Sequence, residues 1–207
     1  MRKRGRERID EEKPELLVVC PMCGPFSSWQ SINYQAMEEE DVRKKLAEAL
    51  THLKYSLELC HRQWKAGRLF IFEHPVAATS WGTKMMSSML RLTGVQMVSF
   101  DFCGLGMKTT NNKNETQPAR KRTRVLTNSG HIAAALKRYQ CSGGHTHAHL
   151  EGGRPKACEE YPQEFCEVIV RGLQRELEDQ KFVDAAYEKI DREARGQEWK
   201  WHGGPRA

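Results

Sequence analysis

Apolar residues gather in four short runs that predict β-strands. The first run is ELLVVC, residues 15–20, and the second is Leu69–Phe72, which leads directly into Glu73. The third is VQMVSFDF, 95–102, and the fourth is TRVLTN, 123–128. Short, continuous runs rich in β-branched and aromatic residues are typical of strands buried within a sheet. We therefore expect four strands.

Three other segments have the three- and four-residue spacing of helices. The long segment 37–66 carries acids in its first turn and bases in its last, as the helix dipole prefers, and Gly67 is placed to end it. Its apolar face comprises Val42, Leu46, Leu50, Leu53, Leu57, Cys60 and Trp64. Residues 80–94 predict a shorter helix, and residues 163–193 predict one or two more.

The order of these elements predicts an α/β fold. Strands that alternate with helices favour a parallel sheet with right-handed crossovers, and the two consecutive strands at the end favour an antiparallel strand at its edge. Ligands of such sheets gather at the carboxyl ends of the strands. We therefore expect Cys23 and Glu73 to lie at a common site.

The 207 residues fit one domain with extensions. The sequence divides into a charged, flexible start (1–14), the main α/β part (15–130), an extension with a His/Gly-rich loop and helices (131–193), and a disordered tail (194–207).

Basic residues are concentrated in two places, although the formal net charge is only +6. One is the start, MRKRGRER. The other contains Lys108, Lys113, Arg120, Lys121, Arg122 and Arg124, against the single acid Glu115. Such clusters suit phosphate backbones, which makes DNA a candidate partner. The alternative is a solvated loop and a flexible start.

The seven cysteines occur in a sequence without an apolar signal region and without a run of about 18 apolar residues. This pattern predicts an intracellular protein, nuclear in a eukaryotic cell, with no membrane partner. Its thiols are then expected to be reduced, so that each is a core residue, a metal ligand or a nucleophile.

Cys23 and Glu73 together indicate covalent catalysis. A cysteine just after a strand can have its thiolate stabilised by loop amides and by a following helix. Glu73 follows three large apolar residues, and apolar surroundings favour the protonated carboxyl that can act as an acid. The thiolate would be the nucleophile and the carboxyl the proton donor.

Three motifs in this sequence resemble those of DNA cytosine-5 methyltransferases. CPMCGPFSSW is similar to that family's Gly-Pro-Pro-Cys-x-x-Phe-Ser, with Cys23 at the catalytic cysteine. FEHP is similar to the Glu-Asn-Val or Glu-Asn-Pro motif, with Glu73 at the glutamate. ARKRTRVLTN is similar to Gln-x-Arg-x-Arg followed by a strand, with Arg122 and Arg124 at the arginines.

The likeness is greatest to diverged members carried by phages and retroelements, in which EHP, SW and a late HxHxxL with YP recur. It covers about residues 10–170. It implies that residues 15–130 correspond to the later part of the catalytic domain, a class I, Rossmann-like methyltransferase sheet with an antiparallel edge strand.

The resemblance implies a specific mechanism and site. Cys23 would add to carbon 6 of a flipped-out cytosine while Glu73 protonates ring nitrogen 3, so that carbon 5 takes a methyl group from S-adenosylmethionine. Arg122 and Arg124 would hold the base and its phosphate and help to position the cysteine loop. The implied substrate-binding residues are Phe26, Ser27, His74, Pro75, Arg120 and Lys121.

The sequence also departs from the family pattern. Met22 replaces a proline, His74 an asparagine and Arg120 a glutamine. Only fourteen residues, mostly charged, precede the predicted strand, so the half that binds S-adenosylmethionine is expected to come from a second polypeptide or a missing N-terminal segment. DFCGLG, residues 101–106, weakly resembles the family's loop that binds the methyl donor. The alternative is therefore a permuted cofactor site, in which the donor loop follows the catalytic motifs in the chain.

Two other functions remain open. One is a non-catalytic nucleic-acid-binding module that keeps the sheet and the basic stretch. The other is a zinc-stabilised interaction protein, with ligands drawn from Cys141, His145, His147 and Cys158, or from Cys20 and Cys23 as a CxxC pair. The simplest alternative to a zinc site is a solvent-exposed, Gly-rich loop around residues 141–158.

Overall fold

The computed structural model describes residues 2–150 and 158–196. The longer helices are α1 (Arg2–Glu12), α3 (Glu39–Lys65), α4 (Lys84–Leu90), α5 (Gly130–Leu136) and α7 (Gln163–Gly196), with a short α2 (Gln30–Asn33). The strands are β1 (Leu16–Val19), β2 (Leu69–Pro75), β3 (Gln96–Asp101), β4 (Lys108–Thr110), β5 (Thr116–Pro118) and β6 (Arg122–Thr127). Single 3-10 turns are η1 (Gly24–Phe26), η2 (Tyr34–Ala36), η3 (Thr79–Gly82) and η4 (Phe102–Leu105). The expectation of a mixed helix and strand fold is confirmed.

The main sheet has the strand order β1-β2-β6-β3. β1 and β2 are parallel, whereas β6 runs antiparallel to both of its neighbours, β2 and β3. The prediction of an antiparallel strand at the sheet edge is therefore wrong, because β6 lies between two strands. The physical reason is burial on both of its faces: Val125 and Leu126 point to opposite sides of the sheet and are both fully buried.

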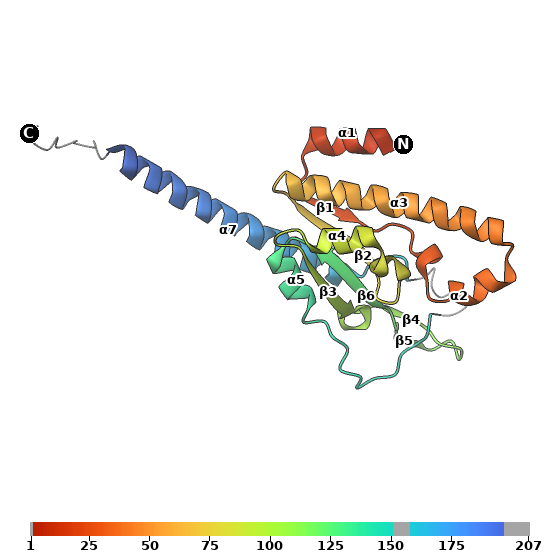
Figure 1. Cartoon of the computed structure of the whole chain (residues 1–207). Helices are drawn as coiled ribbons and strands as arrows, with labels where there is room; N and C mark the ends of the chain where they lie inside the picture. Colours follow the sequence, from red (N-terminus) through yellow and green to blue (C-terminus); the bar gives the residue numbers. More distant parts are fainter. Residues whose placement is uncertain (1, 151–157, 197–207) are drawn as a thin grey trace, which may run out of the picture.

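Helices cover both faces of this sheet (Figure 1). α3 and α4 pack on one face through a core that contains Leu53, Phe72 and Met86. α5 and the first part of α7 pack on the other face, with Phe100, Ile132 and Phe165. Successive strand residues point to opposite faces, so neighbouring side chains in β2 and β6 enter different cores.

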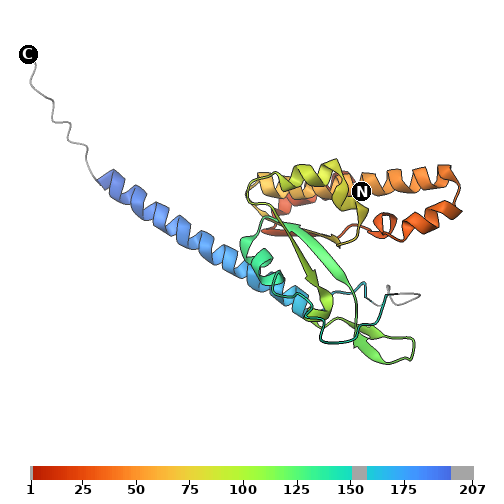
Figure 2. The same cartoon turned by 60° about the horizontal axis from the view of Figure 1, so that its bottom comes forward.

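α7 continues well beyond the core. Its first turns pack on α5, and the rest of the helix projects away from the body of the molecule (Figure 2). Phe182, Tyr187 and Ile190 on the projecting part are exposed. No helix in residues 2–150 and 158–196 is long and apolar enough to cross a membrane.

The charged start forms α1, although the sequence predicts a flexible segment. Arg6 Nε donates to Glu58 Oε1 at 2.6 Å, and Arg62 donates to Asp10 Oδ2 at 2.9 Å. Charged residues of α1 therefore form ion pairs with oppositely charged residues of α3. Amino-acid composition alone does not predict this pairing. The predicted disordered tail overlaps the end of α7 at residues 194–196, and its remainder, 197–207, lies outside the described residues.

Candidate active site at the cysteine loop

The parallel pair β1 and β2 brings the cysteine loop beside Glu73. Val19 pairs with Phe72, so Cys20 continues alongside Glu73, and the loop then reaches Cys23. Glu73 lies inside β2, two residues before the end of that strand, rather than at its tip as the sequence predicts. The additional strand length comes from His74 and Pro75, which pair with Arg124 and Thr123 of β6.

Both carboxyl oxygens of the buried Glu73 have hydrogen-bond partners. The Tyr161 hydroxyl donates to Oε2 at 2.9 Å, and the Thr123 hydroxyl contacts Oε1. The Thr123 oxygen also lies 3.0 Å from the backbone oxygen of His74. A hydroxyl has one proton, so Thr123 can donate to only one of these two oxygens.

Tyr161 is held by aromatic and cationic neighbours. Its ring stacks on Phe102 at 5.7 Å between centroids, and Lys121 Nζ lies 5.5 Å from the Tyr161 centroid. Lys121 also donates to the backbone oxygen of Cys158 at 2.9 Å. Burial raises the pKa of Tyr161, and the charge of Glu73 raises it further. Tyr161 therefore remains a hydrogen-bond donor. Lys121 is directed toward Tyr161 and Cys158 and not outward toward a phosphate.

The Cys23 thiol is close enough to Glu73 to be affected by its charge. Burial raises the pKa of Cys23, and the negative charge of Glu73 adds to the effect. The sequence predicts a stabilised thiolate, but the helix that follows Cys23 is only the three-residue turn Gly24–Phe26. Such a turn has few aligned peptide dipoles, so it provides little stabilisation of a negative charge.

Cys20 is exposed, whereas its position at the end of an apolar run predicts a core residue. Its thiol nevertheless faces Tyr161. The pKa of Cys20 is raised to about 11, chiefly because neighbouring groups shield the sulfur from water even though the residue as a whole is accessible.

His74 anchors the cysteine loop from the opposite face of the sheet. Its Nε2 lies 3.0 Å from the backbone oxygen of Pro21, and its Nδ1 lies 2.8 Å from Ser80 Oγ. A carbonyl oxygen only accepts, so Nε2 is assigned the proton and Nδ1 accepts from Ser80. Burial lowers the pKa of His74, which keeps the ring neutral in this arrangement.

The other residues of the cysteine and glutamate motifs contact neighbouring parts of the fold. Phe26 is buried, with its ring 5.9 Å from that of His74. Ser27 Oγ accepts from the backbone of Trp29 at 3.3 Å, and the Pro75 oxygen accepts from Trp81 Nε1 at 2.8 Å. The structure thus brings His74 and Phe26 together, but in the core beneath the loop rather than beside Glu73.

Arg122 and Arg124 lie on the face of the sheet opposite Glu73. Arg124 pairs with His74 in the strand register, Arg124 Nε donates to Ser99 Oγ at 3.1 Å, and its guanidinium lies 5.4 Å from the Trp81 ring centroid. Arg122 is exposed, 3.9 Å from Asp101. Arg124 therefore lies beside His74 and Arg122 beside Asp101, whereas Thr123 between them reaches Glu73.

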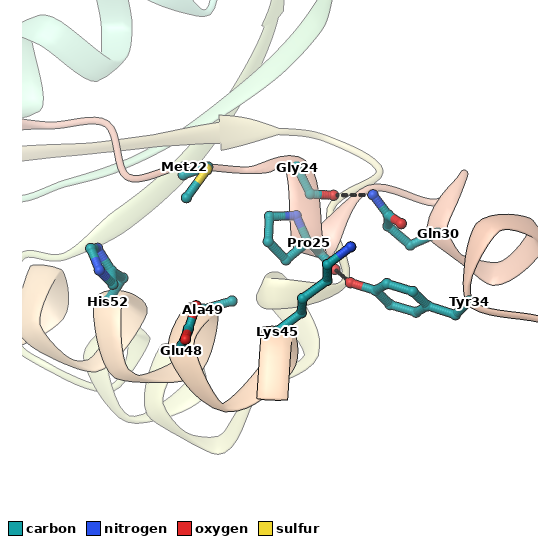
Figure 3. A pocket seen from close by; sticks show the side chains of 9 residues that line it. All are labelled: Met22, Gly24, Pro25, Gln30, Tyr34, Lys45, Glu48, Ala49 and His52. Atoms are coloured by element: carbon teal, nitrogen blue, oxygen red, sulfur yellow. Dashed lines mark hydrogen bonds between the residues drawn. The ribbon is translucent and has the colours of Figure 1, made fainter. Parts of the chain in front are cut away.

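Two cavities flank this region. One of about 340 Å³ lies between the cysteine loop and α3, and Met22, which is 68 % exposed, points into it together with His52 (Figure 3). The Tyr34 hydroxyl and Gln30 Nε2 donate to loop carbonyls at the other end of this cavity. The second cavity, of about 410 Å³, is lined by Arg120, Lys121 and Arg122 together with residues of the 141–147 loop.

The structure brings three of the four candidate zinc ligands together. Cys141, His145 and His147 converge, and the fourth member of their cluster is Cys103. Cys158 instead packs in the core between the sheet and α7. Residues 151–157 of the predicted loop lie outside the described residues.

In the stretch Asp101–Gly106, the acidic residue that a methyl-donor loop would use is engaged within the chain. Asp101 accepts from the backbone N–H of Cys141 at 3.0 Å and lies 3.9 Å from Arg122, and Cys103 is grouped with Cys141, His145 and His147. Gly104 packs against Tyr139. These contacts disfavour the comparison of this stretch with a donor loop.

No family model matches the chain, and comparisons with curated proteins and with solved structures also find no match. Three residues of these sites, Thr123, Tyr161 and Cys103, are not assigned roles by sequence reasoning. Tyr161 belongs to the Tyr-Pro pair that recurs in the diverged methyltransferases this sequence resembles, and that pair was the sequence signal that could have indicated a role for Tyr161. Thr123 stands between the two motif arginines, and Cys103 stands in the stretch compared with a donor loop.

Proposed function

We propose that this chain is a DNA cytosine-5 methyltransferase-like protein whose own residues carry out the covalent addition to the cytosine base. The observation that supports the proposal is the position of the Cys23 loop, which follows β1, beside the parallel strand β2 that carries Glu73, so that the charge of Glu73 acts on the Cys23 thiol. Tyr161 and Thr123 hold both oxygens of that buried carboxyl. The motif resemblance is the reason for choosing cytosine as the substrate.

In the proposed step, the Cys23 thiolate forms a bond to carbon 6 of a flipped-out cytosine. The π electrons of the C5=C6 double bond form a C4=C5 double bond, and the π electrons of the C4=N3 double bond move onto N3, which takes a proton from Glu73. The thiol proton leaves to solvent. Because the charge of Glu73 raises the pKa of Cys23, a protonated Glu73 is the form that favours both the thiolate and the proton donation.

His74 and Arg124 are proposed as positioning residues. The His74 hydrogen bond to Pro21 fixes the loop two residues before Cys23. Arg124 lies over Trp81, whose indole binds the Pro75 carbonyl at the end of β2. Both residues act through the backbone of the cysteine loop and of β2.

Methyl transfer itself would use S-adenosylmethionine as the source of the methyl group. Because Asp101 is engaged by Cys141 and Arg122, we propose that a second polypeptide or a further segment of chain holds this donor. The exposed bases Lys108, Lys113, Arg120 and Arg122 are proposed to contact the phosphate backbone of DNA.

The test measures addition to cytosine without requiring a methyl donor. Reversible attack at carbon 6 makes carbon 5 exchange its hydrogen with solvent, so DNA incubated with the chain in deuterated water should gain deuterium at cytosine C5. We expect exchange with the native chain, and loss of at least about 100-fold in Cys23→Ala and Glu73→Gln. Cys166→Ser, at an exposed cysteine on α7, is the matched control and should retain exchange.

The second candidate is a non-catalytic nucleic-acid-binding module, favoured by the exposed bases around the β4–β5 hairpin. Salt-dependent DNA binding with no exchange, and with no adduct to DNA containing 5-fluorocytosine when S-adenosylmethionine is present, would contradict the enzyme. That result would support the binding module.

A further inference from the structure

Four metal-binding side chains converge from two separate segments of the chain. Cys103 belongs to the turn η4 that follows β3, and Cys141, His145 and His147 belong to the loop that follows α5. Each offers one ligand atom, and all four atoms lie within 4.8 Å of one another. This group lies outside the contacts of Glu73 and Cys23.

Three of the four distances given below fall within the range expected for a tetrahedral zinc site, and the fourth, between the two histidine nitrogens, is shorter by about 0.3 Å. With Zn–S bonds of about 2.3 Å and Zn–N bonds of about 2.0–2.1 Å, ligand atoms around one tetrahedral zinc lie roughly 3.3–3.8 Å apart. Cys141 Sγ lies 3.7 Å from His145 Nε2 and 3.4 Å from His147 Nε2. His147 Nε2 lies 3.0 Å from His145 Nε2 and 3.4 Å from Cys103 Sγ.

Hydrogen bonding alone does not account for this arrangement. His147 Nε2 is close to three other ligand atoms, yet one ring nitrogen carries either one proton or one lone pair. It can therefore make one good hydrogen bond at most among the three. A cation at the centre would use all four atoms at once.

Backbone N–H groups support both sulfurs, as thiolate ligands require. The Gly143 N–H donates to Cys141 Sγ at 3.4 Å, and the Gly104 N–H donates to Cys103. Gly143 has a φ of +77°, which favours glycine at this turn. Asp101 Oδ2 accepts from the Cys141 backbone and fixes the start of the loop.

We propose that Cys103, Cys141, His145 and His147 bind one structural Zn²⁺ ion. Two thiolates and two imidazoles suit zinc, and four protein ligands leave no open position for a substrate or a catalytic water. The ion would fasten the 141–147 loop to the end of β3. Directly after this loop, Ala148 pairs with Ala119, and the Arg120 N–H donates to Ala148 O at 3.0 Å.

The first experiment is metal analysis of the full chain, produced with zinc in the medium and freed of loose metal by gel filtration. We expect about one equivalent of zinc per chain, and less than a tenth of that in Cys103→Ser and Cys141→Ser. The matched control Cys166→Ser changes an exposed cysteine on α7 and should keep its zinc. A native chain without zinc, or a Cys103→Ser variant that keeps it, would overturn the proposal.

Cobalt substitution separates ligand loss from misfolding. The native chain titrated with Co²⁺ should show the intense visible absorption of tetrahedral cobalt together with sulfur-to-metal charge transfer. His147→Ala should lose this spectrum, whereas His147→Cys, which restores a ligand, should recover a tetrahedral spectrum with more sulfur character. A weak octahedral spectrum from the native chain would contradict the four-ligand site.

Discussion

The Tyr161 hydroxyl donates a hydrogen bond of 2.9 Å to Glu73 Oε2, although the two residues are 88 positions apart in the sequence. Glu73 comes from the middle of the chain, and Tyr161 comes from the segment that leads into α7. The extension after residue 130 is therefore part of the candidate active site and not an appendage to it. The contact also ties the candidate active site to the helix that packs on α5.

Removal of the Tyr161 hydroxyl should affect both stability and chemistry. Tyr161→Phe leaves one oxygen of the buried Glu73 without a donor, so we expect the free energy of unfolding to fall by about 1–3 kcal/mol. Denaturant titration measures this change. Tyr139→Phe, which removes a hydroxyl bonded to the more accessible Glu164, is the matched control and should cost less. An equal loss in both variants would contradict a special role for Tyr161.

The four strands of the main sheet and the long helices follow closely from local sequence, whereas β4, β5 and α5 were not predicted. Alternation and helical spacing are local properties, so the ends of α3 and of β3 are predicted within two residues of their observed positions. The place of β6 between β2 and β3 depends on pairing between distant segments, which local patterns do not encode. The same holds for α1, because its partners Glu58 and Arg62 are 52 positions away from Arg6 and Asp10.

The residues of the candidate sites likewise fall into two groups, those that local sequence identifies and those that depend on tertiary packing. Cys23 and Glu73 could be predicted from strand ends and motifs, because each lies on a strand or loop that sequence identifies. The partners of Tyr161 and Cys103 could not be predicted, although Tyr161 belongs to the YP pair, because both residues reach their partners only through tertiary packing. For the metal cluster, three ligands lie within one loop and were visible in the sequence, and Cys103 is 38 positions before Cys141.

The reactivity of Cys23 should depend on Glu73. Since burial and the Glu73 charge raise the pKa of Cys23, we expect its alkylation by iodoacetamide to be slow at pH 7 and to accelerate as the pH rises. Glu73→Gln removes the charge and should increase the rate at pH 7 by about two- to tenfold. Peptide mass spectrometry follows the site, with the exposed Cys166 as an internal standard. An unchanged rate in Glu73→Gln would mean that the two side chains do not interact.

The packing of α7 on α5 depends on Gly172. A Cβ atom at this position would lie 2.6 Å from Ile132 Cγ1 and 3.1 Å from Ile132 Cα, so the helices would have to move apart. We expect Gly172→Ala to lower the free energy of unfolding by about 1–3 kcal/mol, in spite of the better helix propensity of alanine. Val170→Ala, at an exposed position of the same helix, should change it little. A stabilised Gly172→Ala variant would show that α5 and α7 do not pack as closely as the structure has them.

His74 should make stability fall as the pH falls. Its pKa in the folded state is lowered by burial, so below about pH 6.5, the ordinary value, the unfolded state binds more protons and unfolding becomes easier. The contribution is fully present above that pH and is lost as the pH falls toward the folded-state pKa. Denaturant titrations of the native chain between pH 8 and pH 5 should show this decline, and His74→Gln should reduce it. The glutamine amide nitrogen can take the place of His74 Nε2 and donate to the Pro21 carbonyl, but it does not titrate. A decline of the same size in both proteins would assign the acid sensitivity to other groups.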